Sequence, residues 1–95
     1  MAFLISQEAD NDIVALYEIG ARTYGLESAA AYAAQLRERF QFLAEFPRSV
    51  RERDEVTPPV RIAPFRGHII AYRIENEDVV VIRVLHHSAD WQSEL

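Results

Sequence analysis

The chain has 95 residues, a formal net charge of −5 and no cysteine, and all ten of its basic residues are arginines. This length predicts a single domain over residues 1–95, and the missing cysteines exclude disulfides, thiolate metal sites and a cysteine nucleophile. The acidic balance argues against direct binding to nucleic acid, and the lack of a basic start or of a run of roughly 20 apolar residues predicts a cytoplasmic chain outside the membrane. Arginine pairs with carboxylates through its planar fork, which favours protein partners, although a GC-rich coding bias gives the same composition.

The first segment predicts a short strand followed by an amphipathic helix. Residues 2–5 are apolar, and Ser6 is placed to accept hydrogen bonds from the free backbone N–H groups at the start of a helix. Apolar residues then recur at three- and four-residue steps up to Gly25, which offers a left-handed stop. The expected stripe consists of Ala9, Ile13, Leu16, Tyr17, Gly20 and Tyr24.

A second amphipathic helix is predicted from about Glu27 until Pro47, which forbids its continuation. The short connection makes the two helices an antiparallel hairpin. Phe42 and Phe46 lie off the apolar stripe and need cover, either from the loop that follows or from an amphipathic helix of a partner. The stripe itself consists of Ala29, Ala33, Leu36, Phe40 and Leu43.

The remaining chain predicts a polar loop and then a meander of three antiparallel strands. Residues 48–59 are polar and end in a Thr-Pro-Pro run, which favours a long surface loop. Residues 60–65, 68–75 and 78–86 are rich in β-branched and aromatic side chains and are separated by turn residues, which is typical of strands.

The register of the last two strands depends on the length of the loop between them. A three-residue loop at 75–77 gives one apolar face for the helices to cover and leaves Arg73 and Arg83 on the opposite face. A loop of two or four residues would swap the faces of one strand. The expected apolar face consists of Ile70, Tyr72, Ile74, Val80, Ile82 and Val84.

The end of the chain carries two histidines and the single tryptophan. Neighbouring residues of a strand point to opposite faces, so His86 and His87 are not expected to ligate one metal, and no cofactor is expected. His86 is predicted at the rim of the core with its ring hydrogen-bonded, and His87 on the surface. Trp91 is predicted to pack over the open end of the core, with exposure to a partner as the alternative. Ser88 is expected to cap a short last turn.

The order and spacing of these residues resemble the ParE branch of the RelE/ParE toxin superfamily. Val50 departs from the pattern, because this family usually has glycine there. The resemblance implies an α+β fold in which an N-terminal strand and an antiparallel helical hairpin pack on a three- to four-stranded antiparallel sheet. The matching residues are Ala9, Asp12, Ile13, Tyr17, Gly20, Gly25, Tyr32, Leu43, Ala44, Pro47, Arg51, Arg53, Arg61, residues 68–73, residues 82–86 and Asp90.

The resemblance also implies a function. A ParE-like chain is the toxin of a type II toxin-antitoxin pair, is neutralised by a ParD-like antitoxin and inhibits DNA gyrase when free, without being an enzyme. The neighbouring RelE branch instead cleaves messenger RNA on the ribosome, and the fold alone does not separate the two. A degenerate toxin that binds only its antitoxin is a third possibility.

The candidate site residues help to weigh these possibilities. RNA cleavage without a metal needs a general acid or base beside fixed positive charge. The candidates include one plausible proton carrier and no lysine, which favours a protein-binding function over cleavage. A solvated or ion-paired sheet face is the alternative for the strand arginines, and an unpaired strand edge is a further place for an antitoxin segment. The expected partner-binding residues are Phe42, Phe46, Arg61, Arg73, Arg83, His87 and Trp91.

Overall fold

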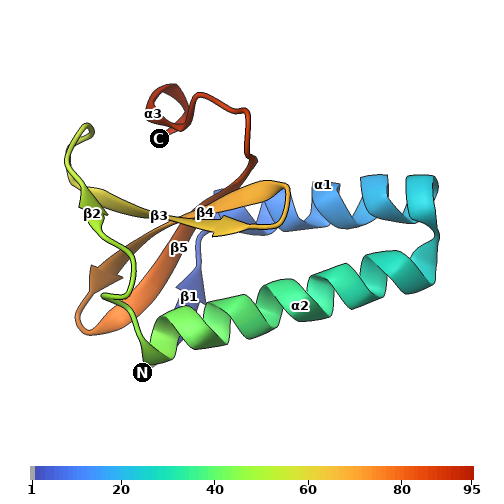
Figure 1. The fold of residues 1–95 in the computed structure, drawn as a ribbon, viewed down its shortest axis with the longest axis horizontal. Helices are drawn as coiled ribbons and strands as arrows, with labels where there is room; N and C mark the ends of the chain where they lie inside the picture. Colours follow the sequence, from blue (N-terminus) through green and yellow to red (C-terminus); the bar gives the residue numbers. More distant parts are fainter. Residues whose placement is uncertain (1) are drawn as a thin grey trace.

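A computed structural model describes residues 2–95 as a helical hairpin packed on a five-stranded sheet, with a short helix at the C-terminal end (Figure 1). The predicted α+β class, with its N-terminal strand and helical hairpin, is confirmed. The elements are β1 (Phe3–Ile5), α1 (Gln7–Tyr24), α2 (Leu26–Glu45), β2 (Glu52–Arg53), β3 (Val60–Phe65), β4 (His68–Glu75), β5 (Asp78–His86) and α3 (Trp91–Glu94).

The sheet has more strands than predicted and is not purely antiparallel. Its order is β1-β5-β4-β3-β2, with β1 parallel to β5 and the other neighbours antiparallel. The expected surface loop over residues 48–59 contains β2, whose two residues pair with Val60 and Arg61 of β3. A strand of two residues is too short to show an alternating pattern, so β2 could not be predicted from its residues.

The predicted register of β4 and β5 is wrong near the turn. Asn76 and Glu77 alone connect the strands, and both have positive φ (51° and 70°), as in the primed turns that suit the twist of a hairpin. The shorter loop turns Val79 and Val81 into the core in place of the expected Val80 and Ile82. A register shift at Ala71/Tyr72 then returns Val84 to the buried face, as predicted.

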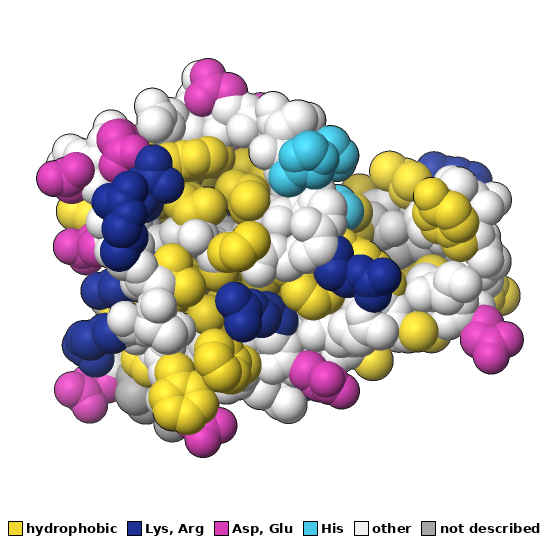
Figure 2. All heavy atoms as spheres, viewed as in Figure 1, with side chains coloured by type: hydrophobic (Ala, Val, Ile, Leu, Met, Phe, Trp, Pro, Cys, Tyr) yellow, Lys and Arg dark blue, Asp and Glu magenta, His cyan; other side chains and the backbone are white. Residues whose placement is uncertain are grey.

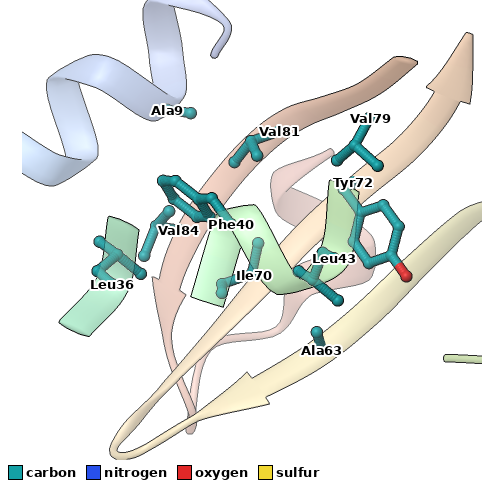
Figure 3. Packing of buried hydrophobic residues seen from close by; sticks show 10 residues of the cluster. All are labelled: Ala9, Leu36, Phe40, Leu43, Ala63, Ile70, Tyr72, Val79, Val81 and Val84. Carbon is teal, nitrogen blue, oxygen red and sulfur yellow. The ribbon is translucent and has the colours of Figure 1, made fainter. Parts of the chain in front are cut away.

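The core lies between α2 and the sheet. Leu36, Phe40 and Leu43 of the predicted stripe point down onto the strands (Figure 3). The buried Tyr72 hydroxyl donates to the Pro47 carbonyl oxygen at 2.8 Å, which satisfies both groups and fastens the end of α2 to β4. The sheet side of this cluster consists of Ala63, Ile70, Tyr72, Val79, Val81 and Val84.

The two predicted boundaries of α1 are confirmed. The Ser6 hydroxyl accepts from the Ala9 N–H at 3.0 Å and donates to the Ile82 carbonyl oxygen at 2.7 Å, so it caps the helix and contacts β5. Gly25, with φ of 96°, is the single residue between Tyr24 and α2. A connection this short fixes the two helices side by side in opposite directions.

The predicted buried stripe of α1 is only partly buried. Ala9 is fully buried, but Tyr17 and Tyr24 are 39% and 77% exposed. The hairpin extends past the end of the sheet in Figure 1, so its distal half has no strands to pack on. The amphipathic pattern therefore continues beyond the part of the helix that the core can use.

Candidate functional site

The distal half of the hairpin and the adjacent end of the sheet form a groove of about 1030 Å³, here called the hairpin groove. Leu16 and Leu36 belong to its apolar wall, and Arg66, His68 and His86 lie at its polar end. We did not predict this groove, because the pattern of α1 assigned its aromatic side chains to the core. The sequence does contain a sign of the groove, because the apolar positions of α1 continue to its last turn at Tyr24.

A second exposed apolar feature is the aromatic pair Phe42 and Phe46. The two rings are 5.1 Å apart, and 42% and 50% of the two residues are exposed. The Arg39 guanidinium lies 5.0 Å from the Phe42 ring. The prediction that residues 48–59 bury these two rings is wrong, because that segment turns away from α2 and its strand β2 pairs with β3. Figure 2 shows hydrophobic side chains at the surface near the C-terminal end of α2.

Three histidines gather beside the groove. His68 and His86 are paired across β4 and β5 with ring centroids 5.8 Å apart, and the His86 and His87 rings are 4.4 Å apart. The expectation that these two neighbours diverge is wrong, since the strand ends at His86. Ser88 shares a 2.6 Å hydrogen bond with His86 Nδ1 and does not cap α3, contrary to expectation. Within residues 2–95 no three His, Asp or Glu side chains are grouped to hold a metal ion.

His68 is the histidine most affected by its surroundings. Its Nδ1 shares a 2.6 Å hydrogen bond with the Tyr32 hydroxyl, which ties β4 to α2. Burial lowers the pKa of His68, and the neighbouring His86 and His87 lower it further. Burial raises the pKa of Tyr32, against the opposing effect of Arg66. Both groups are therefore held in their neutral forms near pH 7.

The pH dependence of stability should report this environment. Because the unfolded chain protonates His68 more readily than the folded chain does, the free energy of unfolding is expected to fall as the pH drops below about 6.5. Urea unfolding at pH 8 and pH 5.5 measures the loss. The same loss in H68Q, which keeps the carboxylates and the other histidines, is expected to be smaller. Equal losses in both proteins would contradict this assignment.

Arg83 is held in an ion pair, which was the alternative weighed for it. Its Nε and Nη2 donate to the Asp12 carboxylate at 2.8 and 3.0 Å, and Glu94 lies 3.6 Å from Nη1. The hydrogen bond to Asp12 raises the pKa of Arg83. The same carboxylate accepts from the Val84 N–H at 2.9 Å. This pair joins α1 to β5 and leaves Arg83 with few free donors.

Arg61 and Arg73 hold the segments that flank β2. Arg61 donates to the Val50 carbonyl oxygen, and Arg73 donates to those of Pro58 and Pro59, both at 3.3 Å. These carbonyl acceptors carry no formal charge, so they do not neutralise the positive charge of either guanidinium. Neither arginine lies on the hairpin groove.

Trp91 packs against β2 and not over the open end of the core. It is half-buried, and the Arg53 guanidinium lies 5.1 Å from its ring centroid. Arg53 is also paired with Glu55. Trp91 therefore packs against the protein, as predicted, but it packs against β2 and not over the end of the core. The position was missed because β2 was not predicted.

The two edges of the sheet differ. The outer side of β5 is covered along most of its length. β1 pairs with Val79 to Val81, the Ser6 hydroxyl donates to the Ile82 carbonyl oxygen, and the Asp12 carboxylate accepts from the Val84 N–H. On the other edge, β2 covers only the first two residues of β3, and beyond them the side of β3 that faces away from β4 has no strand partner among residues 2–95. Pro64 lies in that open edge and has no N–H to donate. Pro64 therefore disfavours strand addition along the β3 edge.

The seven predicted site residues thus do not form one surface. Phe42 and Phe46 form the aromatic pair, while Arg61 and Arg73 lie near β2. Arg83, His87 and Trp91 each contact a different neighbour.

From residue 2 onward, no helix combines the length and the apolar character that crossing a bilayer requires.

A strand, a helical hairpin, a four-strand segment and a short last helix define an α+β fold with a mixed five-stranded sheet. A solved structure titled "Chromosomal ParDE TA system from P. aeruginosa" contains a chain with this fold, at a TM-score of 0.78 and 18% identity, covering 90% of this chain and 95% of that one. A family model described as the ParE toxin of the type II toxin-antitoxin system parDE matches residues 3–91. The chain therefore belongs to the ParE toxin family.

Two named relatives agree with this assignment. Toxin ParE1 of Caulobacter vibrioides is 27% identical over 93 residues, which cover 98% of this chain and 96% of the relative. Toxin ParE1 of Mycobacterium tuberculosis is 28% identical over 89 residues, which cover 93% of this chain and 91% of the relative. The similarity thus spans nearly the full length of both proteins in each comparison.

Proposed function

We propose that this toxin is neutralised by a ParD-like antitoxin and that the free chain inhibits DNA gyrase without catalysing a reaction. The observation that carries the proposal is the apolar surface left open on the hairpin, together with membership of the ParE family. Apolar side chains that lie together at the surface of a small domain are typical of an interaction site.

The hairpin groove and the aromatic pair suit an amphipathic helix. Such a helix lays its apolar side chains into a groove at three- and four-residue steps. Arg66 and the neighbouring His68 and His86 place positive or protonatable groups at one end of the groove. A helix with an acidic residue at that end would complement both the shape and the charge of this surface.

The placement of the candidate catalytic residues supports binding over RNA cleavage. Arg83 is engaged by Asp12, and the ring of His87 lies 4.4 Å from that of His86. The Tyr72 hydroxyl already donates to Pro47, and burial raises its pKa. Metal-free cleavage needs a positive charge that is free to meet the phosphate and a proton carrier that is available, and the ion-paired Arg83 and the hydrogen-bonded Tyr72 fit neither role.

Supercoiling by purified gyrase is the direct test. The chain is expected to inhibit supercoiling of a relaxed plasmid, and the antitoxin encoded beside it is expected to restore the activity. Ribosome-bound message in a translation extract should stay intact. Untouched supercoiling at large excess of the chain would contradict the proposal, and cleaved message would establish the RelE-like alternative. Tight antitoxin binding with neither activity would indicate a degenerate toxin.

A further inference from the structure

A small hollow of about 390 Å³ lies at the end of the sheet that carries β2, away from the distal hairpin. Three arginines, Arg48, Arg61 and Arg73, line it, and we call it the arginine hollow. Figure 2 shows basic side chains gathered at this end of the molecule. Such a cluster is unexpected in a chain with a net charge of −5.

The charges of these three arginines are not neutralised by ion pairs. Arg61 and Arg73 donate only to backbone carbonyl oxygens, which are neutral. No hydrogen bond joins the side chain of Arg48 to any residue from 2 to 95. The ion pairs found in that same range use Arg53 and Arg83 instead. The hollow therefore presents guanidinium groups with unused donors.

The hydrogen bonds of Arg61 and Arg73 also organise the walls of the hollow. They hold the backbone at Val50 and at Pro58 and Pro59, so these two guanidinium groups are positioned before any ligand arrives. A ligand that meets positioned donors loses less free energy to ordering than one that must arrange them. An oxyanion is the chemical class that such donors recognise, because a guanidinium offers its N–H groups in a planar fork.

The rim of the hollow limits the charge of the ligand. Glu52 and Glu75 line it as well, so three arginines and two glutamates leave a net charge of +1. One carboxylate would balance this charge. A nucleic acid would bring several phosphates close to the two glutamates, where like charges repel. The balance therefore favours a single acidic side chain.

We propose that the arginine hollow accepts a carboxylate side chain of a partner polypeptide. The hollow is lined by residues of β2, β3 and β4, and Figure 1 shows β2 at the opposite end of the molecule from the distal hairpin. The hollow therefore provides a second point of attachment besides the hairpin groove. The inference rests on the proposed function only in taking the partner to be a polypeptide. It adds the chemistry that this partner presents and the residues that receive it.

The Nε–H resonances of the arginines in a ¹⁵N-labelled chain test the site directly. The probe is the acetylated and amidated peptide (Ala-Glu)₄, and the matched control is (Ala-Gln)₄. We expect the resonances of Arg61 and Arg73 to shift saturably with the glutamate peptide and to stay unchanged with the glutamine peptide. R48Q is expected to raise the midpoint concentration about fivefold, which corresponds to about 1 kcal/mol. R22Q, on the distal part of α1, should leave the midpoint unchanged.

Three results of the peptide titrations would overturn the proposal. These are the absence of a saturable shift, an equal response to the glutamine peptide, and an unchanged midpoint in R48Q. Saturation by an octauridylate at a lower concentration than the glutamate peptide would assign the hollow to a nucleic acid and would also overturn it. The titration contains neither antitoxin nor gyrase, so its outcome is separable from that of the supercoiling test.

Discussion

Replacing Asp12 with alanine is expected to lower the free energy of unfolding by about 3 kcal/mol. The Asp12 carboxylate accepts two hydrogen bonds from Arg83 and one from the Val84 N–H, at 2.8 to 3.0 Å. The side chains of Asp12 and Arg83 are only 16% and 21% exposed, so water replaces these bonds poorly. Equilibrium urea unfolding, followed by circular dichroism, measures the change.

Asp10 provides the matched control for this substitution. It lies on the same helix, is exposed and belongs to the acidic first turn, so D10A should cost less than about 1 kcal/mol through the helix dipole. D12N keeps an acceptor for the Val84 N–H but removes the charge, and its loss should lie between the two. A D12A loss no larger than that of D10A would show that the ion pair does not join α1 to the sheet.

Replacing Phe46 with alanine is expected to weaken binding of the antitoxin about 30-fold. We expect Phe46 to be a hot spot of the interface, where truncating an aromatic side chain costs about 2 kcal/mol, and this energy corresponds to that factor. Half of Phe46 is exposed in the free chain, so the fold should survive the truncation. Titration calorimetry with the purified antitoxin measures the affinity, and circular dichroism checks the fold.

Leu4 on β1 is the control for the aromatic pair. It is 53% exposed and lies outside the hairpin groove, so L4A should leave the affinity unchanged. An unchanged affinity in F46A, and also in F42A, would move the antitoxin contact away from this end of α2. The hairpin groove would then remain as the proposed surface for the helix.

Local patterns were sufficient to predict most of the elements. The three strands 60–65, 68–75 and 78–86 were predicted with the bounds that β3, β4 and β5 have. Alternating β-branched residues and turn residues encode these bounds locally, so neighbouring residues suffice to find them. The β4–β5 register was missed because Asn76 and Glu77 form a two-residue primed turn without glycine, and because a bulge has no local signature.

The candidate site was harder to predict, because exposure depends on which elements meet. Phe42 and Phe46 are exposed because the segment after α2 contains β2, which pairs with β3. The spacing of residues in that segment does not predict this pairing. Tyr24 is exposed because the hairpin is longer than the sheet beneath it. The pairing of Asp12 with Arg83 joins residues 71 positions apart, beyond the reach of any periodicity.

The pairing of β1 with β5 affects how the protein is made. Phe3 lies opposite Val79, so the strand that leaves the ribosome early has no partner until 76 further residues have been added. At about 5–20 residues per second, this delay is roughly 4–15 s. Parallel pairing across such a separation is also slow to form. A nascent chain that stops short of residue 79 cannot complete its sheet, so the folded toxin appears only after that point in translation.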